Sequence, residues 1–301
     1  MKKLLLIDTY NFLHRAYHAI PKTFRDKDGN PTNVIYGFTS MLINLFGQLK
    51  PDYVLAALDN EKPTFRVENF TGYKAHRKPL DIEFSSQLPG VVEVLKAFNI
   101  RTWELDGYEA DDIIGTACNK FGGKVDIVIV SNDRDLWQLV NEHVSIMVPG
   151  KGDFVEWIGE KEIMTRLGLK PHQIIDYKGL RGDPSDNIPG VHGVGEKTAL
   201  KLVSQYGSIE EIYKNISKIE PPSLREKLAN NAEEAVISKN LTSIITDAPF
   251  SLTLEDCKYS EFSKVAVRDL LQRYNFRSLI RRLGFEIKET PKPDESQLQL
   301  L

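Results

Sequence analysis

Nine acidic residues in five groups have the types and spacings from which a metal site could be built. They are Asp8, Asp59, Glu109, Asp111, Asp112, Asp133, Asp135, Asp183 and Asp186. Carboxylates that are brought close together raise each other's pKa unless cations lie between them. Because no histidine or cysteine stands within these groups, the ligands would all be oxygen atoms, which select Mg²⁺ or Mn²⁺ over zinc.

Two such ions about 3.5–4 Å apart form a site that cleaves phosphodiester bonds, because one activates a water and the other stabilises the leaving oxygen. Any one of these acids can also be explained as a helix cap or a first-turn residue. The joint pattern is harder to explain in that way. We therefore predict a site for two divalent ions.

The elements that must position these acids can be seen in the hydrophobic pattern. Short apolar runs at 4–7, 53–57 and 125–130 are typical of buried strands, and helical patterns at 33–49, 87–98 and 110–121 alternate with them. This alternation predicts an α/β fold with a mostly parallel sheet covered by helices. Sites in such sheets form at the carboxyl ends of the strands, where Asp8, Asp59 and Asp133 follow the three runs.

The composition excludes several classes of protein. The formal net charge of −3 over 301 residues does not by itself indicate a nucleic-acid binder. Two cysteines are too few for a disulfide framework or a cysteine zinc site. No apolar run approaches the roughly 18 residues of a membrane span, and the first run is too short for a signal peptide. We expect a soluble, cytoplasmic protein.

The chain is predicted to have three parts. An α/β catalytic domain covers 1–165, a helical lobe covers 166–290, and a polar tail covers 291–301. Within the first part, the segment 62–89 is basic and rich in aromatic residues, and it is inserted between a strand and a helix, where functional excursions occur. A second basic stretch at 264–288 is either a solvated helix or an added contact with phosphate.

A glycine-rich segment joins two helical stretches at about 183–206. Its functional candidates are Gly190, Gly193, Gly195, Lys197 and Thr198. Free backbone N–H groups at the start of a helix bind phosphate, and here a lysine stands beside them. The segment resembles a helix–hairpin–helix element, which holds duplex DNA by its backbone without reading sequence. The alternative is a plain turn between helices.

Several longer motifs carry a family resemblance. They are Thr64-Phe65-Arg66, Tyr73-Lys74-Ala75-His76-Arg77, Gly107-Tyr108-Glu109-Ala110-Asp111-Asp112, Asp133-Arg134-Asp135-Leu136 and the run from Gly182 to Val191. With them the chain resembles the 5′-nuclease (flap endonuclease) family over about 3–284. It is most similar to the N-terminal 5′-nuclease domain of bacterial DNA polymerase I and to stand-alone bacterial 5′-3′ exonucleases.

The resemblance implies a PIN-like fold and a role for each candidate residue. The seven acids up to Asp135 would hold the catalytic metals, directly or through water, and Asp183 and Asp186 would complete the second-metal side. The segment 62–89 would form a helical arch over the 5′ strand, in which Lys74 and Arg77 contact the scissile phosphate. Further contacts with DNA are implied for Arg15, Tyr17, Arg66 and Lys78, and a K⁺ ion for the glycine hairpin.

Some expectations remain open at this stage. Tyr17 could stack on an unpaired base or could pack in the core. The family usually continues its first aspartate with Gly-Asn-Ser, whereas Thr9-Tyr10-Asn11 follows here, and Asn132 and His192 also depart from the usual pattern. None of these departures replaces a carboxylate.

The chain ends with a short peptide similar to the motif that binds the bacterial sliding clamp. Its candidate contacts are Gln297, Leu298, Leu300 and Leu301. The motif follows a polar tail, as suits a tethered ligand, and it favours a stand-alone nuclease over a polymerase fragment. A chance apolar ending is the alternative.

We therefore predict a monomeric, metal-dependent 5′-3′ exonuclease and flap endonuclease that acts in replication and repair at the nucleoid. Its substrates would be duplex DNA with 5′ ends or flaps, including RNA primers. A PIN-like ribonuclease would lack the arch and the hairpin. A non-catalytic binder of DNA junctions would not need nine carboxylates beside a polyanion.

Overall fold

The computed structural model describes the chain except residues 61, 151–153, 261 and 286–301. Six strands form one sheet in the order β3-β2-β1-β4-β5-β6. All neighbouring pairs are parallel except β5 and β6. The strands are β1 (Lys3–Asp8), β2 (Tyr53–Ala57), β3 (Arg101–Trp103), β4 (Asp126–Val130), β5 (Val144–Pro149) and β6 (Val155–Ile158). The predicted mostly parallel α/β sheet is confirmed.

The three predicted strands are β1, β2 and β4, the centre of the sheet. The other three were not predicted, for reasons that their sequences show. Strand β3 has only three residues, and β6 is an antiparallel edge strand of four residues in which only Ile158 is buried. In β5, Ser145 interrupts the apolar pattern.

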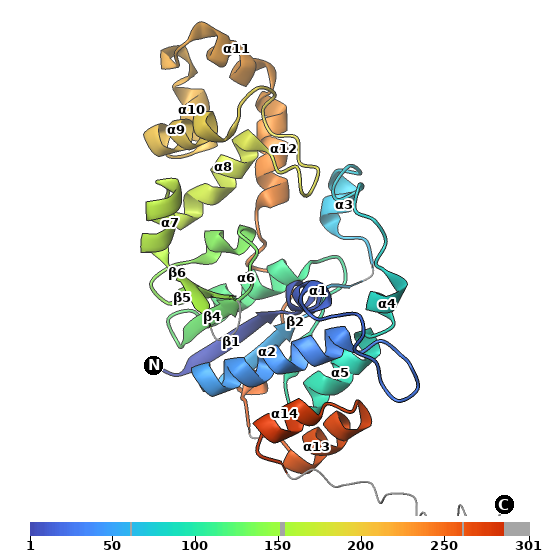
Figure 1. Cartoon of the computed structure of the whole chain (residues 1–301). Coiled ribbons are helices and arrows are strands. Elements are labelled where there is room, and N and C mark those ends of the chain that lie inside the picture. Colours follow the sequence, from blue (N-terminus) through green and yellow to red (C-terminus); the bar gives the residue numbers. More distant parts are fainter. Residues whose placement is uncertain (61, 151–153, 261, 286–301) are drawn as a thin grey trace, which may run out of the picture.

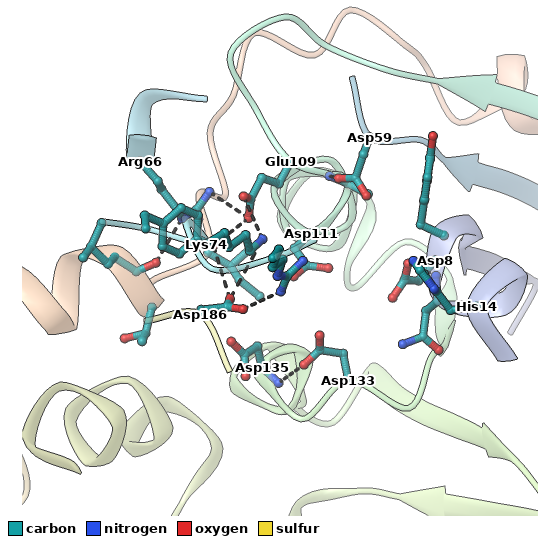
Figure 2. A pocket seen from close by; sticks show the side chains of 18 of the residues that line it. Asp8, His14, Asp59, Arg66, Lys74, Glu109, Asp111, Asp133, Asp135 and Asp186 are labelled. Carbon is teal, nitrogen blue, oxygen red and sulfur yellow. Dashed lines mark hydrogen bonds and ion pairs between the residues drawn. The ribbon is translucent and has the colours of Figure 1, made fainter. Parts of the chain in front are cut away.

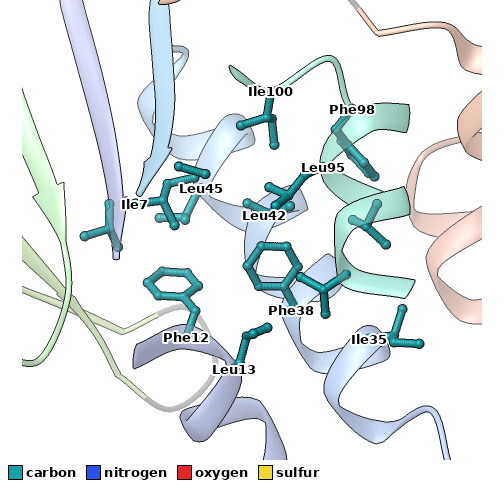
Figure 3. Close-up of a cluster of buried hydrophobic side chains, with 14 of the residues drawn as sticks. Ile7, Phe12, Leu13, Ile35, Phe38, Leu42, Leu45, Leu95, Phe98 and Ile100 are labelled. Atoms are coloured by element: carbon teal, nitrogen blue, oxygen red, sulfur yellow. The ribbon is translucent and has the colours of Figure 1, made fainter. Parts of the chain in front are cut away.

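Successive residues of β1 point to opposite faces of the sheet and so belong to two different cores. Leu5 and Ile7 pack with α1 (Thr9–Ala19), α2 (Asn33–Leu49) and α5 (Leu88–Ala97). Figure 3 shows this core, with Phe12 and Phe38 beneath the strands. Leu4 and Leu6 pack on the other face against α6 (Ala110–Phe121). Burial on both faces fits the continuous apolar runs of the sequence.

A second lobe stands beyond the carboxyl ends of the strands (Figure 1). It contains α7 (Glu160–Leu167), α8 (Ile174–Arg181), α9 (Glu196–Tyr206), α10 (Ile209–Lys214), α11 (Pro222–Asn230) and α12 (Ala232–Thr242). It has its own core, with Leu180, Val203 and Ile212 among the buried residues. Helix α8 ends at Arg181 with Gly182 as its C-cap, directly before the predicted glycine-rich segment.

The last two described helices do not belong to this lobe, which corrects the prediction for 166–290. Helices α13 (Lys264–Arg273) and α14 (Arg277–Arg282) bury Leu271 and Ile280 in the core of α2 and α5. Arg273 forms an ion pair with Glu93, and Arg282 donates to Oγ of Ser40 at 2.9 Å. These contacts give the basic stretch a structural role in the first lobe.

The inserted segment 62–89 contains two short helices, α3 (Phe65–Asn69) and α4 (Ile82–Ser85), joined by turns. The predicted arch is therefore helical only in part. Buried Tyr73 packs with Ile188 and Leu241, so the segment contacts the second lobe as well as the sheet. None of the helices in the described ranges has the length and apolarity needed to cross a membrane.

Candidate active site

Seven of the nine predicted acids line one pocket of about 430 Å³ at the carboxyl edge of the sheet (Figure 2). They are Asp8, Asp59, Glu109, Asp111, Asp133, Asp135 and Asp186. Lys74 and Arg77 of the inserted segment line the same pocket. The parallel register of β1 with β2 and β4 explains this convergence, because all three strands end at one edge.

Asp8 is the last residue of β1 and also the N-cap of α1. Its carboxylate accepts hydrogen bonds from the backbone N–H of Asn11 at 3.2 Å and from Oγ of Ser131 at 2.7 Å. Asp59 accepts from the backbone N–H of Ala110, the first residue of α6, at 2.8 Å. The capping explanation is therefore correct for these two acids. Capping occupies only part of each carboxylate, which also faces the pocket.

Burial and mutual repulsion hold several of these carboxyl groups far from their ordinary ionisation. Burial and the charges of Asp59 and Asp133 raise the pKa of Asp8 to about 7, against the two hydrogen bonds that it accepts. The pKa of Asp111 rises well above its usual range because of burial and the charges of Asp133 and Asp8. Burial is also the main cause of the raised pKa values of Asp59 and Asp133. This pocket lacks sufficient positive charge for its acids.

The positive charge that is present comes largely from the inserted segment. Nζ of Lys74 lies 2.8 Å from Oε1 of Glu109, and the hydroxyl of Tyr73 donates to Oε2 of the same carboxylate at 3.0 Å. Arg77 forms an ion pair with Asp186, whose backbone oxygen accepts from the N–H of Lys74 at 2.9 Å. The dashed lines in Figure 2 trace this network around Lys74. The segment is thus closed over the acids.

Asp112 does not line the pocket, and Arg66, which lines it, is paired with Asp112. Asp112 is fully buried, and its two oxygens accept from Nη1 and Nη2 of Arg66 at 2.7 and 2.8 Å. Arg66 is 2% exposed and also donates to the backbone oxygens of Leu241 and Ser243. This buried pair joins α3, α6 and the end of α12 and uses both oxygens of Asp112, so the metal role predicted for Asp112 is wrong, while the DNA contact predicted for Arg66 stays a prediction.

Asp183 faces a cation that the sequence analysis missed. Lys178 of α8 is buried, and its Nζ lies 2.6 Å from Oδ2 of Asp183 and also contacts Asp135. Although burial opposes it, the hydrogen bond from Lys178 holds the pKa of Asp183 below its usual value. The one available signal was a lysine in the last helical turn before an acidic turn.

The first helix lines the pocket with residues other than the predicted Arg15 and Tyr17. Tyr17 is 9% exposed, packs against Phe84, and donates to Asp81 at 2.6 Å. Arg15 donates to the backbone oxygen of Gly150. The core-packing alternative for Tyr17 is therefore correct. Lys78 is exposed near the pocket, while Asn11 and His14, which were not predicted, line it.

The glycine-rich segment divides into a structural part and an open part. Gly190 has a φ of +63°, and its N–H donates to Oγ of Ser238 at 2.9 Å, so it packs inside the lobe and has no N–H for DNA. Gly195 caps α9, whose first turn receives no side-chain cap. Gly193 and Lys197 are exposed and Thr198 is half-buried. Of the segment predicted to contact the duplex, the part that is open to a ligand is the start of α9.

The acids of the pocket are less tightly clustered than the ligands of a bound metal ion. In the described part of the chain, no three acidic, histidine or cysteine side chains are arranged to hold one ion. Glu109, Asp135, Asp183 and Asp186 are occupied by lysine or arginine. By contrast, the carboxylate of Asp111 accepts no hydrogen bond from any described residue.

This fold and this site together define a 5′ nuclease. Two family models match the chain: one described as 5′-3′ exonuclease, N-terminal resolvase-like domain, over residues 3–168, and one described as 5′-3′ exonuclease, C-terminal SAM fold, over residues 169–265. The chain belongs to the 5′-3′ exonuclease family. The family and enzyme class predicted from the sequence are confirmed.

Curated relatives agree with this assignment. The chain is 41% identical to DNA polymerase I of Caldicellulosiruptor bescii over 310 residues, which cover 99% of the chain and 36% of that polymerase. It is 40% identical to DNA polymerase I of Bacillus subtilis over 96% of the chain and 33% of the relative. The chain therefore spans about a third of the length of these relatives.

Solved structures share the fold at lower identity. T5 5′-exonuclease with bound zinc ions superposes with a TM-score of 0.67 at 22% identity, over 92% of this chain and 98% of that one. The catalytic core of Rad2 in complex with DNA substrate gives 0.59 at 15% identity, over 96% and 93%. The sheet, the inserted segment and the helical lobe thus form an architecture found in other nucleases.

Proposed function

We propose that the chain hydrolyses phosphodiester bonds near the 5′ ends and 5′ flaps of duplex DNA, including RNA primers, in replication and repair. The observation that carries this proposal is the convergence of seven carboxylates in one pocket under a basic segment. The solved structures of the Rad2 core and of the T5 flap endonuclease contain DNA, which supports DNA as the substrate proposed here.

The donor set fits two divalent cations, Mg²⁺ or Mn²⁺. All candidate ligands are oxygens, and the raised pKa values of Asp8 and Asp111 show that the pocket needs positive charge. Asp8, Asp59, Glu109, Asp111, Asp133 and Asp135 would hold the ions, directly or through water, and Asp183 and Asp186 would complete the second-metal side once the lysines and the arginine that bind these acids withdraw. When bound, such ions supply an activated water and stabilise the leaving oxygen.

Lys74 and Arg77 would act on the substrate itself. Both reach into the pocket from the inserted segment, and both now bind carboxylates in the place of a phosphate. A bound phosphate offers the same kind of oxygen acceptor with more charge. In the substrate complex these two residues would orient the scissile phosphate and stabilise the negative charge that develops on it.

The helical lobe would hold the duplex. The exposed start of α9, with Gly193, Gly195, Lys197 and Thr198, presents uncapped N–H groups and a lysine to a phosphate backbone. A K⁺ ion at this turn would neutralise phosphate in the same place. Contacts of this kind carry no sequence information, which suits an enzyme that selects structure.

Other expectations rest on the sequence alone. The clamp-binding residues Gln297, Leu298, Leu300 and Leu301 lie outside the described residues, and we propose that they bind the sliding clamp of a bacterial cell. We also propose a monomer that acts at the nucleoid in the cytoplasm. Removing 297–301 should abolish co-elution with the clamp and leave cleavage of a free flap unchanged.

The deciding experiment is cleavage of a labelled 5′-flap duplex in Mg²⁺ by the wild-type protein and its Asp133→Asn variant. We expect cuts near the flap junction by the wild type and a loss of at least about 10²-fold in the variant, as for other electrostatic catalytic groups. Tight flap binding without cleavage in Mg²⁺ or Mn²⁺ would instead make the chain a non-catalytic junction binder.

A further inference from the structure

A second pocket, of about 410 Å³, borders the candidate active site on the side of the helical lobe. It shares Asp133 and Asp135 with the first pocket. Its remaining wall comes from η1 (Asp135–Leu139), the end of α8, and Glu196 at the start of α9. It therefore lies between the acids and the proposed duplex contact at α9.

Two arginines of this second pocket keep donors available for an anion. Cζ of Arg134 lies 5.5 Å from the centroid of the Trp137 ring, and Cζ of Arg181 lies 5.9 Å from that of Tyr177. Such cation–π contacts hold a guanidinium in place without using its N–H groups. Within the described residues Arg134 forms no ion pair, whereas Arg181 meets Glu196 at 4.0 Å and shares a side-chain hydrogen bond with Tyr177, which leaves its other donors for an anion.

The aromatic rings beneath these arginines are not platforms for bases. Trp137 is 4% exposed and Tyr177 is 6% exposed, so neither offers a free face to a nucleobase. Lys178, the third cation of the pocket, is already held by two aspartates. The cationic groups that remain for a ligand are the two guanidinium groups, which recognise phosphate, and the carboxylates of Asp133 and Glu196 line the same pocket.

We propose that the second pocket binds the sugar–phosphate backbone of the duplex next to the cleaved bond, with Arg134 and Arg181 as its phosphate contacts. This inference rests on the proposed function, because it takes the strand at the acids to be the substrate. It adds a binding site that connects the acids with α9, so that the duplex is held close to the bond that is cut.

The salt dependence of DNA binding tests this site. We would measure the binding of a labelled blunt duplex by fluorescence anisotropy in EDTA over a series of KCl concentrations. The binding constant falls as the salt concentration rises, and each phosphate contact makes the slope of log K against log salt steeper by about 0.9. Arg134→Ala and Arg181→Ala should therefore each make this slope shallower by about 1, and the double variant should make it shallower by about 2. Lysine substitutions should retain most of the slope, because the charge remains.

Arg101→Ala is the matched control, since Arg101 also lies over an indole ring, that of Trp103 at 5.9 Å, and lines neither pocket. Its slope should equal that of the wild type, and equal thermal midpoints would show that the variants are folded. If the double variant has the same salt dependence of binding as the wild type, the inference is overturned. An equal loss for single-stranded DNA of the same length would also overturn it, because the pocket would then hold the unpaired strand.

Cleavage of the 5′-flap duplex by the wild-type protein in Mg²⁺ is measured in parallel. If the wild type binds duplex but does not cleave, the proposed function fails. If it cleaves while both arginine variants keep the wild-type slope, only the second pocket is rejected.

Discussion

Lys74 and Glu109 form an ion pair of 2.8 Å across the pocket, between the inserted segment and the start of α6. The same lysine donates its backbone N–H to the oxygen of Asp186 at 2.9 Å. A divalent cation at these acids competes directly with the lysine, because it offers more charge to the same oxygens. We therefore expect metal binding and the position of the inserted segment to be coupled.

We predict that Mg²⁺ or Mn²⁺ speeds hydrogen exchange at the backbone N–H of Lys74, relative to EDTA, because the ions displace the side chain that holds the segment down. Mass spectrometry of peptides covering 70–78 measures this change. Lys74→Met, which lacks the ion pair in either buffer, should exchange at one fast rate. Slower exchange in the wild type with metal would contradict the coupling.

We predict that Arg66→Met destabilises the protein by about 3–5 kcal/mol, because it leaves the buried carboxylate of Asp112 without its partner. Denaturant unfolding in EDTA measures the change. The double variant Arg66→Met, Asp112→Leu should recover part of this loss, since no buried charge remains. Lys62→Ala, which breaks an exposed pair with Asp106, is the control and should change stability little.

We predict that Lys178→Met makes the stability of the protein depend strongly on metal. Without this buried cation, Asp135 and Asp183 repel each other in EDTA, and a divalent ion between them relieves the repulsion. The thermal midpoint should fall in EDTA, and it should rise more on addition of Mg²⁺ than that of the wild type does. An equal rise in both proteins would show that Lys178 does not compensate these acids.

We predict that the metal-free protein loses stability as the pH rises from about 4 to about 7, because the carboxyl group of Asp8 loses its proton in this range. Its pKa is raised from 3.8 to about 7, so the folded state holds a proton that the unfolded state has lost. The stabilisation is complete below pH 3.8 and is lost through pH 7, at no more than about 1.4 kcal/mol per pH unit.

The comparison of the wild type with Asp8→Asn isolates this effect, because asparagine keeps an acceptor for the N–H of Asn11 and does not titrate. The variant should gain stability relative to the wild type as the pH rises through this window in EDTA. Urea unfolding at several pH values measures the difference. A constant difference across the window would show that the carboxyl group of Asp8 is ionised throughout.

The sequence predicted the acids of the site well, because their positions follow from the strands. Asp8, Asp59 and Asp133 come at or just after the carboxyl ends of strands that are apolar and buried on both faces, and parallel strands end together. No tertiary information was needed for that step. The edge strand β3 and the antiparallel β6 were missed because short, half-exposed strands have no distinct pattern.

What could not be predicted are the partners of these acids. Arg66 pairs with Asp112, which is 46 residues away, and with backbone oxygens that lie some 175 residues further along the chain. Both residues stand in motifs rich in charge, so their sequence context resembles that of residues that meet DNA or metal. Only the packing of α3 against α6 and α12 shows that they meet each other.

The return of α13 and α14 to the first lobe has a mechanical consequence. The chain leaves the sheet after β6, builds the helical lobe from α7 to α12, and comes back along 243–263 to pack under α2 and α5 (Figure 1). The lobe is therefore joined to the first part of the chain by two connections of the backbone, and also by side-chain contacts such as Lys178 with Asp135 and Arg66 with the oxygen of Leu241. A duplex held by this lobe, as proposed, would therefore be kept in one orientation relative to the carboxyl edge of the sheet.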